Sequence, residues 1–392
     1  MSSGAAPIEN LEGCRSVRLL GAAPAEGHAC DSGAAMAKGA MARPFYRIVG
    51  RPTNYLLALA GILASPAAAP AHAGVGQDRE VLEAVRDADL KLAEIGWRLS
   101  VSNAPLCDRL EPGLGLQLHT LDQFDSAARA AAQKHFGFAT AVAVEGLIAG
   151  SPAERAGIRQ DDSLVRVGLV NIAAMPGKPG TTEKLVATQL AIAALPSDKL
   201  IDVEAIRAGA TIKISIQPVP ACRTRFELRI AEDYRASADG GMVQISSKFL
   251  ESYPLEQVTA AVAHEFSHNI LHHRERLEAR GVDFGMLSGF GANVKYFRQT
   301  EIQADILSVY LLANAGYSPD ASVTFWRNFG PSKAGGIFRS RSHPHWRDRV
   351  ATLKVEIAKL QKLSGRPAIP PLIAERSEPL SGDWQSLLIR QR

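Results

Sequence analysis

The sequence predicts an α+β protein in which a β-rich segment precedes a mostly helical one. Between residues 113 and 218, short apolar runs alternate with Gly, Pro and Asp, which is typical of brief strands and turns. After residue 250 the apolar residues recur at helical spacing instead. Strands followed by helices along the chain indicate the α+β class.

Composition narrows the class of protein further. The chain has 392 residues, of which 46% are hydrophobic and 21% charged, and this length fits two or three globular domains. Lys and Arg number 44 against 40 Asp and Glu, giving a net charge of +4. Because the basic residues are spread along the chain and form no block, we expect no nucleic-acid partner.

Residues 1–73 are predicted to be a leader that ends in a secretory signal peptide. Residues 1–40 are rich in Ala and Gly and show no helical or strand period. Residues 41–73 then carry, in order, a basic region, a short apolar run and a small-x-small cleavage site: Arg43, Arg47 and Arg51, Leu56 to Leu63, and Ala71-His72-Ala73. Translation from Met41 would give the signal an ordinary length.

Cleavage after Ala73 would export the remaining 392 − 73 = 319 residues, in a Gram-negative cell to the periplasm. The alternative is an uncleaved anchor, which would leave the protein associated with the membrane. No later segment reaches the roughly 18 consecutive apolar residues of a membrane span. The sequence does not indicate the oligomeric state.

The exported chain would keep two of the four cysteines, Cys107 and Cys222. An even pair in an oxidising compartment predicts one disulfide that closes a loop of more than a hundred residues. The alternative is a pair of buried free thiols.

The exported chain divides by its local patterns. Residues 78–100 carry apolar residues at mostly helical spacing and are predicted to form one amphipathic helix. Beyond residue 365 the chain becomes Pro-rich and loses its period, so we expect a loosely held tail. The expected divisions are the leader 1–73, an N-terminal helical segment 74–112, a β-rich module 113–220, a helical domain 221–365 and a C-terminal tail 366–392.

A one-turn helix is expected at residues 151–157 within the β-rich module. Ser151 can cap its N-terminus, with Pro152 in the first turn, Glu154 closing a capping box and Gly157 ending the helix. This stretch resembles the Ser-Pro-Ala and Ala-Gly signature of bacterial PDZ domains, although Asp161-Asp162 replaces the usual Gly-Asp. The resemblance implies a module that binds extended peptide by strand addition. Gly113-Leu114-Gly115-Leu116 is either its carboxylate-binding loop or a plain strand start.

The most informative segment is His264-Glu265-Phe266-Ser267-His268, an H-E-x-x-H pattern. On a helix, two imidazoles four residues apart lie on one face and can reach the same metal ion. The opposite face carries an apolar stripe made of Leu255, Val258, Val262, Phe266 and Ile270.

A third ligand is expected from Glu301, which begins a second helical run 33 residues after His268. Asp305, one turn later, can accept a hydrogen bond from the far ring nitrogen of His264 and so fix its tautomer. The alternative is that both carboxylates are ordinary solvated helix charges.

Several motifs occur together in one order along residues 225–355. They are His264-Glu-x-x-His268 with His273 five residues further on, Glu301-x-x-Ala304-Asp305, Ala315-Gly316-Tyr317, and His343-Pro344 with Arg349 six positions after that histidine. In this order they resemble the gluzincin zinc metallopeptidases of the HtpX and CAAX prenyl endopeptidase family. The resemblance implies a mostly helical peptidase domain with a small sheet. The PDZ-like segment and the lack of further membrane spans make the chain similar to the soluble, exported branch.

The ligand set predicts a mechanism. His264, His268 and Glu301 would hold one Zn²⁺, although Co²⁺ or Mn²⁺ would fit the same ligands. Glu265 would act as the general base, and His343 or else Arg349 would stabilise the oxyanion. His343 could instead coordinate zinc in a resting state. We expect His272 and His273 to lie at a helix C-terminus, and His119, His135 and His345 at the surface.

These observations predict an exported zinc metalloendopeptidase that hydrolyses unfolded or extended polypeptides, in envelope protein quality control. Two rival hypotheses remain. One is a catalytically latent PDZ adaptor, and the other is a peptidoglycan hydrolase with the same metal.

Overall fold

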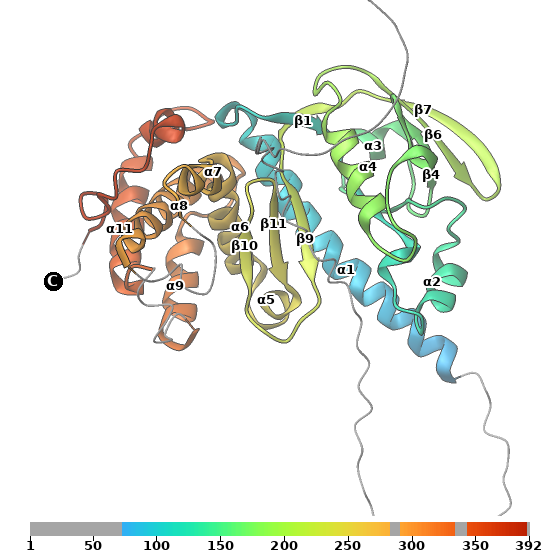
Figure 1. Ribbon diagram of the computed structural model, residues 1–392, viewed down its shortest axis with the longest axis horizontal. Coiled ribbons are helices and arrows are strands. Elements are labelled where there is room, and N and C mark those ends of the chain that lie inside the picture. The colour runs from blue at the N-terminus through green and yellow to red at the C-terminus, as the bar shows by residue number, and fades with distance from the viewer. Residues whose placement is uncertain (1–72, 283–290, 334–342, 390–392) are drawn as a thin grey trace, which may run out of the picture. The chain divides into compact units, whose positions relative to one another are not determined.

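The computed structural model describes residues 73–282, 291–333 and 343–389 (Figure 1). The predicted leader and all but the last residue of the predicted signal peptide lie outside this part of the chain. All of the described residues belong to one compact unit, Pro44–Arg392. Among them, no helix combines the length and the apolarity needed to cross a membrane.

The long helix α1 (Ala73–Ser102) connects the β-rich and helical parts. In Figure 1 it is drawn in blue, and it contacts both β3 and β9. Leu92, Ile95 and Leu99 are fully buried on it, as the predicted amphipathic helix requires. A Cβ on Gly96 would lie 2.4 Å from the ring of Phe226, so glycine is what allows α1 to pack this closely on β9.

The β-rich part is built on an antiparallel sheet in the order β2-β3-β4-β6-β7, with β5 added to β4. Its strands are β2 (Leu116–His119), β3 (Ala143–Leu147), β4 (Ser163–Val167), β5 (Val170–Asn171), β6 (Ile201–Arg207) and β7 (Ala210–Ile216). Three helices accompany the sheet: α2 (Arg129–Phe136), α3 (Pro152–Ala156) and α4 (Glu183–Ala193). Residues such as Val144, Leu164 and Val203 form its core. β2 is an edge strand, with a described partner on one side only.

The short helix α3 has the caps expected from the sequence, with one difference. Ser151 Oγ accepts from the backbone N–H of Glu154 at 3.3 Å, and Gly157 has φ +94°. The prediction of a capping box is wrong by one residue. The Glu154 carboxylate accepts a hydrogen bond from the N–H of Gly150 and not from that of Ser151. The Ser151 N–H is already bonded to the carbonyl of Ile148.

Two smaller sheets follow. β1 (Leu110–Gly113) pairs antiparallel with β8 (Val219–Cys222), so the two ends of the β-rich module lie side by side. A second sheet has the order β10-β11-β9 and consists of β9 (Arg225–Arg229), β10 (Ala236–Ala238) and β11 (Met242–Ser246). β9 and β11 are parallel, and β10 is antiparallel to β11.

The helical part surrounds α6, which packs on α8, α9 and the sheet β10-β11-β9. The α-helices are α5 (Ser247–Ser252), α6 (Leu255–Ile270), α7 (His273–Glu278), α8 (Val294–Asn314), α9 (Asp320–Lys333) and α11 (Trp346–Leu360). Short 3-10 helices lie at Ala104–Leu106, Leu121–Gln123, Ile172–Ala174, Gly291–Asn293 and Pro371–Ser377. The α+β class is therefore correct. Within the predicted apolar stripe of α6, Val258 and Phe266 are fully buried, but Leu255 is 45% exposed because it begins the helix.

The C-terminal tail contradicts the expectation of a loosely held segment. Leu372, Leu380 and Leu388 are buried, and Leu380 is 0% exposed. Arg376 donates to the carbonyl of Leu106, and the backbone of Gly382 donates to the side chain of Gln299. The tail lacks a periodic pattern of apolar residues because its backbone is irregular. Burial of its leucines and hydrogen bonds hold it in place instead.

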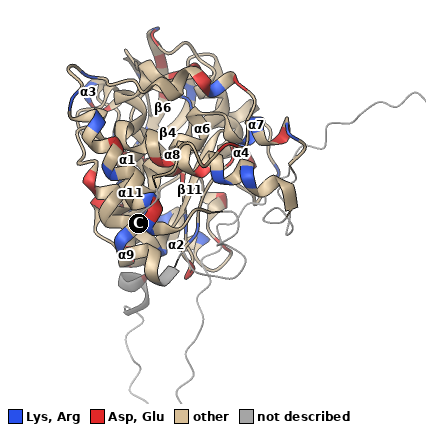
Figure 2. Ribbon diagram, turned by 90° about the vertical axis from the view of Figure 1, so that its left-hand side faces the viewer, with Lys and Arg blue, Asp and Glu red and all other residues tan. Residues whose placement is uncertain are grey.

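Cys107 and Cys222 form a disulfide in the structure, with a sequence separation of 115 residues. It ties the segment after α1 to β8. Along the ribbon in Figure 2, Lys and Arg residues are interspersed with Asp and Glu residues.

Candidate active site

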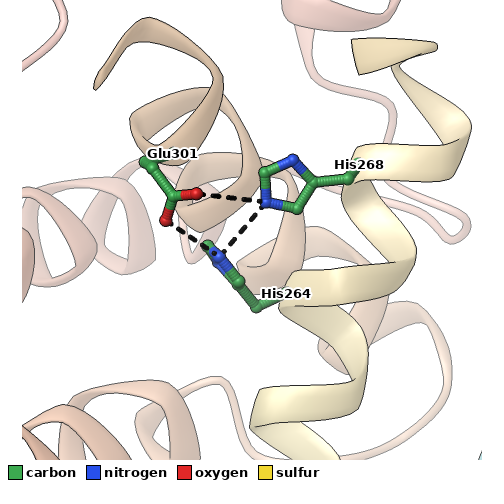
Figure 3. Close-up of side chains that lie close together, drawn as sticks. All are labelled: His264, His268 and Glu301. Carbon is green, nitrogen blue, oxygen red and sulfur yellow. Dashed lines mark hydrogen bonds and ion pairs between the residues drawn. The ribbon is translucent and has the colours of Figure 1, made fainter. Parts of the chain in front are cut away.

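Three side chains from two helices converge at one point (Figure 3). His264 and His268 lie one turn apart on α6, and Glu301 lies on α8. The two Nε2 atoms are 3.3 Å apart, and the Glu301 carboxylate oxygens lie 3.4 Å from Nε2 of His264 and 3.7 Å from Nε2 of His268. One ligand atom of each residue lies within 4.8 Å of the others, so the group could hold a metal ion. Two imidazoles and one carboxylate are a common donor set for catalytic zinc.

The local sequence allows α6 and α8 to bring these ligands together. The two helices pack along much of their length. Ala263 and Ala304, each beside a site residue, are 0% exposed.

The far nitrogen of His264 meets Asp305, as the sequence predicts. Nδ1 lies 3.1 Å from Oδ1 of Asp305. Since an ionised carboxylate can only accept, Nδ1 carries a hydrogen, and Nε2 faces the other ligands. Burial lowers the pKa of His264, but hydrogen bonds to Asp305 and Glu301 outweigh burial and raise that pKa to about 9. Without a metal ion Nε2 therefore also carries a hydrogen, directed at Glu301, and a cation bound there would take the place of that proton.

His268 is held by a second histidine that sequence reasoning did not assign to the site. Nδ1 of His273 lies 2.8 Å from Nδ1 of His268, and its Nε2 lies 3.2 Å from Oε1 of Gln303. Gln303 Oε1 accepts from His273, so His273 Nδ1 is left as an acceptor for the Nδ1–H of His268. The Nε2 lone pair of His268 then faces Glu301. Burial lowers the pKa of His268 to about 3 and also lowers that of His273, which keeps both imidazoles neutral.

The position of His273 differs from the expected helix C-terminus. α6 ends at Ile270, His272 takes the left-handed conformation with φ +52°, and His273 starts α7. This reversal turns His273 back onto His268, and its side chain is buried. The spacing of five residues between His268 and His273 was the available signal, but spacing alone could not reveal the turn between the helices.

Arg349 contacts two carboxylates of the site. It lies on α11, and its Nε and Nη2 donate to the two oxygens of Asp305 at 2.6 and 2.7 Å. Its Nη1 lies 3.4 Å from Glu301, and the residue is 1% exposed. Because its donors are directed at these carboxylates, Arg349 is a positioning residue for Asp305 and Glu301. Its predicted role as an oxyanion donor stays a prediction.

His343 comes to the site from a different segment. Its Nε2 lies 3.5 Å from Oε1 of Glu301, and its side chain is 44% exposed. The structure therefore brings this residue beside the ligand group. Both of its predicted roles, oxyanion donor and additional ligand, remain predictions.

Glu265 shares a cleft with the ligands. Its side chain lines a hollow of about 490 Å³ together with His264, Glu301 and His343. Burial raises the pKa of Glu265 to about 7, with a further contribution from the nearby Glu301. A carboxylate with a pKa near neutrality is suited to take up a proton and release it again.

The comparisons with known proteins agree with this geometry. Residues 285–357 match the model of Peptidase family M48, a family of zinc-dependent peptidases. The matched stretch contains Glu301, Asp305, His343 and Arg349, while the H-E-x-x-H segment lies ahead of it. A search of curated proteins found no match. The match supports a peptidase, and the site has a ligand group that could hold a metal ion.

Proposed function

We propose that this protein is a zinc-dependent metalloendopeptidase. The observation that carries the proposal is the convergence of His264, His268 and Glu301 in one cleft with Glu265. The donor set fits the metal, since the hydrogen bonds of Asp305 and His273 leave both Nε2 atoms directed at the group. Bound zinc would supply Lewis acidity towards a water molecule and the scissile carbonyl.

The chain's own residues would carry the proton transfers. Glu265 takes the proton from the attacking water and passes it to the leaving amine. His343, half-exposed beside Glu301, donates a hydrogen bond to the oxyanion. Asp305 and His273 keep the ligand imidazoles in the required tautomers, and Arg349 holds Asp305 in place.

The substrates that we propose are unfolded or extended polypeptides in the cell envelope. The sequence supports export through residues 41–73, and the Cys107–Cys222 disulfide suits an oxidising compartment. We further propose that the β-rich module is PDZ-like and holds substrate. Its edge strand β2 borders a hollow of about 150 Å³ that is lined by Leu116, Leu118 and Ile192, where an extended peptide can add to the sheet.

Cleavage of an unfolded, casein-like substrate by the purified protein tests this function. Glu265→Gln removes the base, and Glu256→Gln changes an exposed glutamate on the same helix as a matched control. We expect cleavage by the wild type and by Glu256→Gln, loss of cleavage after treatment with a chelator, and none by Glu265→Gln. Zinc bound without cleavage in any of the three would contradict the proposal and favour a latent adaptor. Release of muropeptides from purified sacculi would favour a peptidoglycan hydrolase.

A further inference from the structure

One wall of the active-site cleft is aromatic. Phe325, Trp326 and Phe329 on α9 line it, together with Phe249 and Tyr234. The rings of Phe325 and Phe329 are stacked with centroids 5.1 Å apart, and Phe329 lies 5.7 Å from Phe249. Tyr234 packs edge-on to Phe249 at 5.4 Å. These contacts hold the wall in a defined shape without a ligand.

This wall begins at the reacting centre. The ring of Trp326 lies 6.2 Å from that of His264, and the guanidinium of Arg349 lies 3.6 Å from the centroid of Trp326. Trp326 therefore contacts both the ligand group and the aromatic residues of its own helix. A substrate side chain placed along this wall belongs to a residue that flanks the scissile bond.

The charged side chains that line the cleft all belong to the proposed catalytic site. Among the described residues that line the cleft, the Asp, Glu, Lys and Arg side chains are Glu265, Glu301 and Arg349. Among the described lining residues, the aromatic side of the cleft therefore offers no counter-charge to a substrate side chain. Burying a charged group there would cost far more than burying a hydrocarbon, which gains free energy with the apolar area removed from water.

Gly330 and Trp346 complete the wall. A Cβ on Gly330 would lie 2.6 Å from both Cβ and Cγ of Trp346, so glycine is what lets the indole pack against α9. Trp346 is partly buried at the start of α11 and lines the same cleft. Its ring therefore forms part of the cleft wall, and Trp346 can be substituted without changing any of the proposed metal ligands.

We propose that this aromatic wall is a specificity subsite that accepts a large apolar side chain next to the scissile bond. The subsite deepens the proposed peptidase function and rests on it. It directs the enzyme to segments that folded proteins bury, which is how an endopeptidase can distinguish unfolded from folded chains. Trp346 and Phe329 are specificity-determining residues in this account, and neither touches the reacting atoms.

Mapping of cleavage sites in a mixed peptide library tests the preference. In the wild type, we expect cuts with Phe, Leu, Met, Tyr or Trp on one side of the bond to be at least about 10-fold faster than cuts with Asp, Glu or Lys there. Trp346→Ala should reduce this ratio to a few-fold. Trp384→Ala, which removes the same side chain outside the cleft, should leave it unchanged. Cleavage without a side-chain preference, or with a charged preference, would overturn the subsite.

A binding measurement separates the subsite from the proposed activity. Glu265→Gln is titrated with Ac-Ala-Ala-Phe-Ala-Ala-amide and with the same peptide carrying Asp in place of Phe, and tryptophan emission is followed. We expect the Phe peptide to bind at least about 10-fold more tightly, and Trp346→Ala in the same background to lose most of the difference. Selective binding without cleavage in the wild type would keep the subsite and reject the peptidase. Equal binding of the two peptides would reject the subsite.

Discussion

Arg349 and Asp305 form a buried bidentate ion pair directly behind His264. Two guanidinium nitrogens lie 2.6 and 2.7 Å from the two carboxylate oxygens, and both side chains are 2% exposed. One of the same oxygens lies 3.1 Å from Nδ1 of His264. Arg349 thus holds the carboxylate that orients the first imidazole, and α11 supports the site although it contributes no ligand.

Asp305→Asn should weaken the metal site. The amide removes the negative charge that holds the Nδ1–H of His264 and leaves the buried guanidinium of Arg349 without its partner. We expect zinc affinity to fall by about 10-fold to 100-fold, measured by competition with a chromophoric chelator. Asp320→Asn, at the exposed start of α9, is the matched control and should keep wild-type affinity. Equal affinities of the two variants would show that Asp305 does not orient the ligand.

His273→Phe should act on the second imidazole in a similar way. The substitution fills the buried space but cannot accept the hydrogen bond from Nδ1 of His268. We expect a loss of zinc affinity of about 10-fold to 100-fold with the fold retained by circular dichroism. His272→Asn changes the neighbouring histidine, and asparagine tolerates its left-handed backbone, so this control should bind zinc normally. If both variants lost affinity to the same extent, the helix reversal and not the side chain would be responsible.

Glu111→Gln should stabilise the protein at alkaline pH and not at acidic pH. Burial raises the pKa of Glu111 to about 8 in the folded protein, although Arg223 and Arg225 partly oppose this, from about 4.5 in the unfolded chain. Between these values the unfolded chain releases a proton that the folded protein retains. The contribution of Glu111 to the stability of the wild type is therefore fully present below about pH 4.5 and falls by up to about 5 kcal/mol as the pH rises towards 8.

Urea unfolding at pH 5 and pH 8 checks this prediction. Glu111→Gln should gain stability over the wild type between the two pH values, whereas Glu256→Gln should follow the wild type. A gain that is equal at both pH values would point to packing and not to ionisation.

Cys107→Ser should destabilise the protein without altering the metal ligands. The disulfide closes a loop of more than a hundred residues, and such a loop is worth about 4 to 5 kcal/mol through the entropy of the unfolded chain. We expect the double variant Cys107→Ser with Cys222→Ser to lose a similar amount in chemical denaturation. Unchanged stability of these variants, or free thiols in the oxidised wild type, would contradict this prediction.

The sequence predicts the site best where residues are related by helical spacing. Two histidines four residues apart can share a ligand face on any helix, and Asp305 lies one turn from Glu301 on the same rule. The positions of Arg349 and His273 at the site depend instead on how separate helices pack against each other. Arg349 reaches Asp305 from α11, and His273 turns back at a residue with positive φ, and neither relation leaves a periodic signal.

In the strands, too, the burial of a residue could not always be predicted from the sequence. His119 was expected at the surface, yet it is 0% exposed, with its ring 4.5 Å from that of Phe138 and 5.0 Å from that of Phe136. The pairing of β2 with β3 shifts its register between Gln117 and Leu118. A bulge at that point interrupts the simple alternation of faces along the strand. The expectation was right for His345, which is exposed and caps α11.

X-ray absorption spectroscopy of the purified protein, together with its metal content, tests whether His264, His268 and Glu301 hold a zinc ion. We expect one zinc per chain with a first shell of nitrogen and oxygen near 2.0–2.2 Å, and loss of that zinc in His264→Ala and in Glu301→Ala. Zinc that remains bound in both variants, or a first shell containing sulfur at about 2.3 Å, would contradict the assignment of His264, His268 and Glu301 as the ligands.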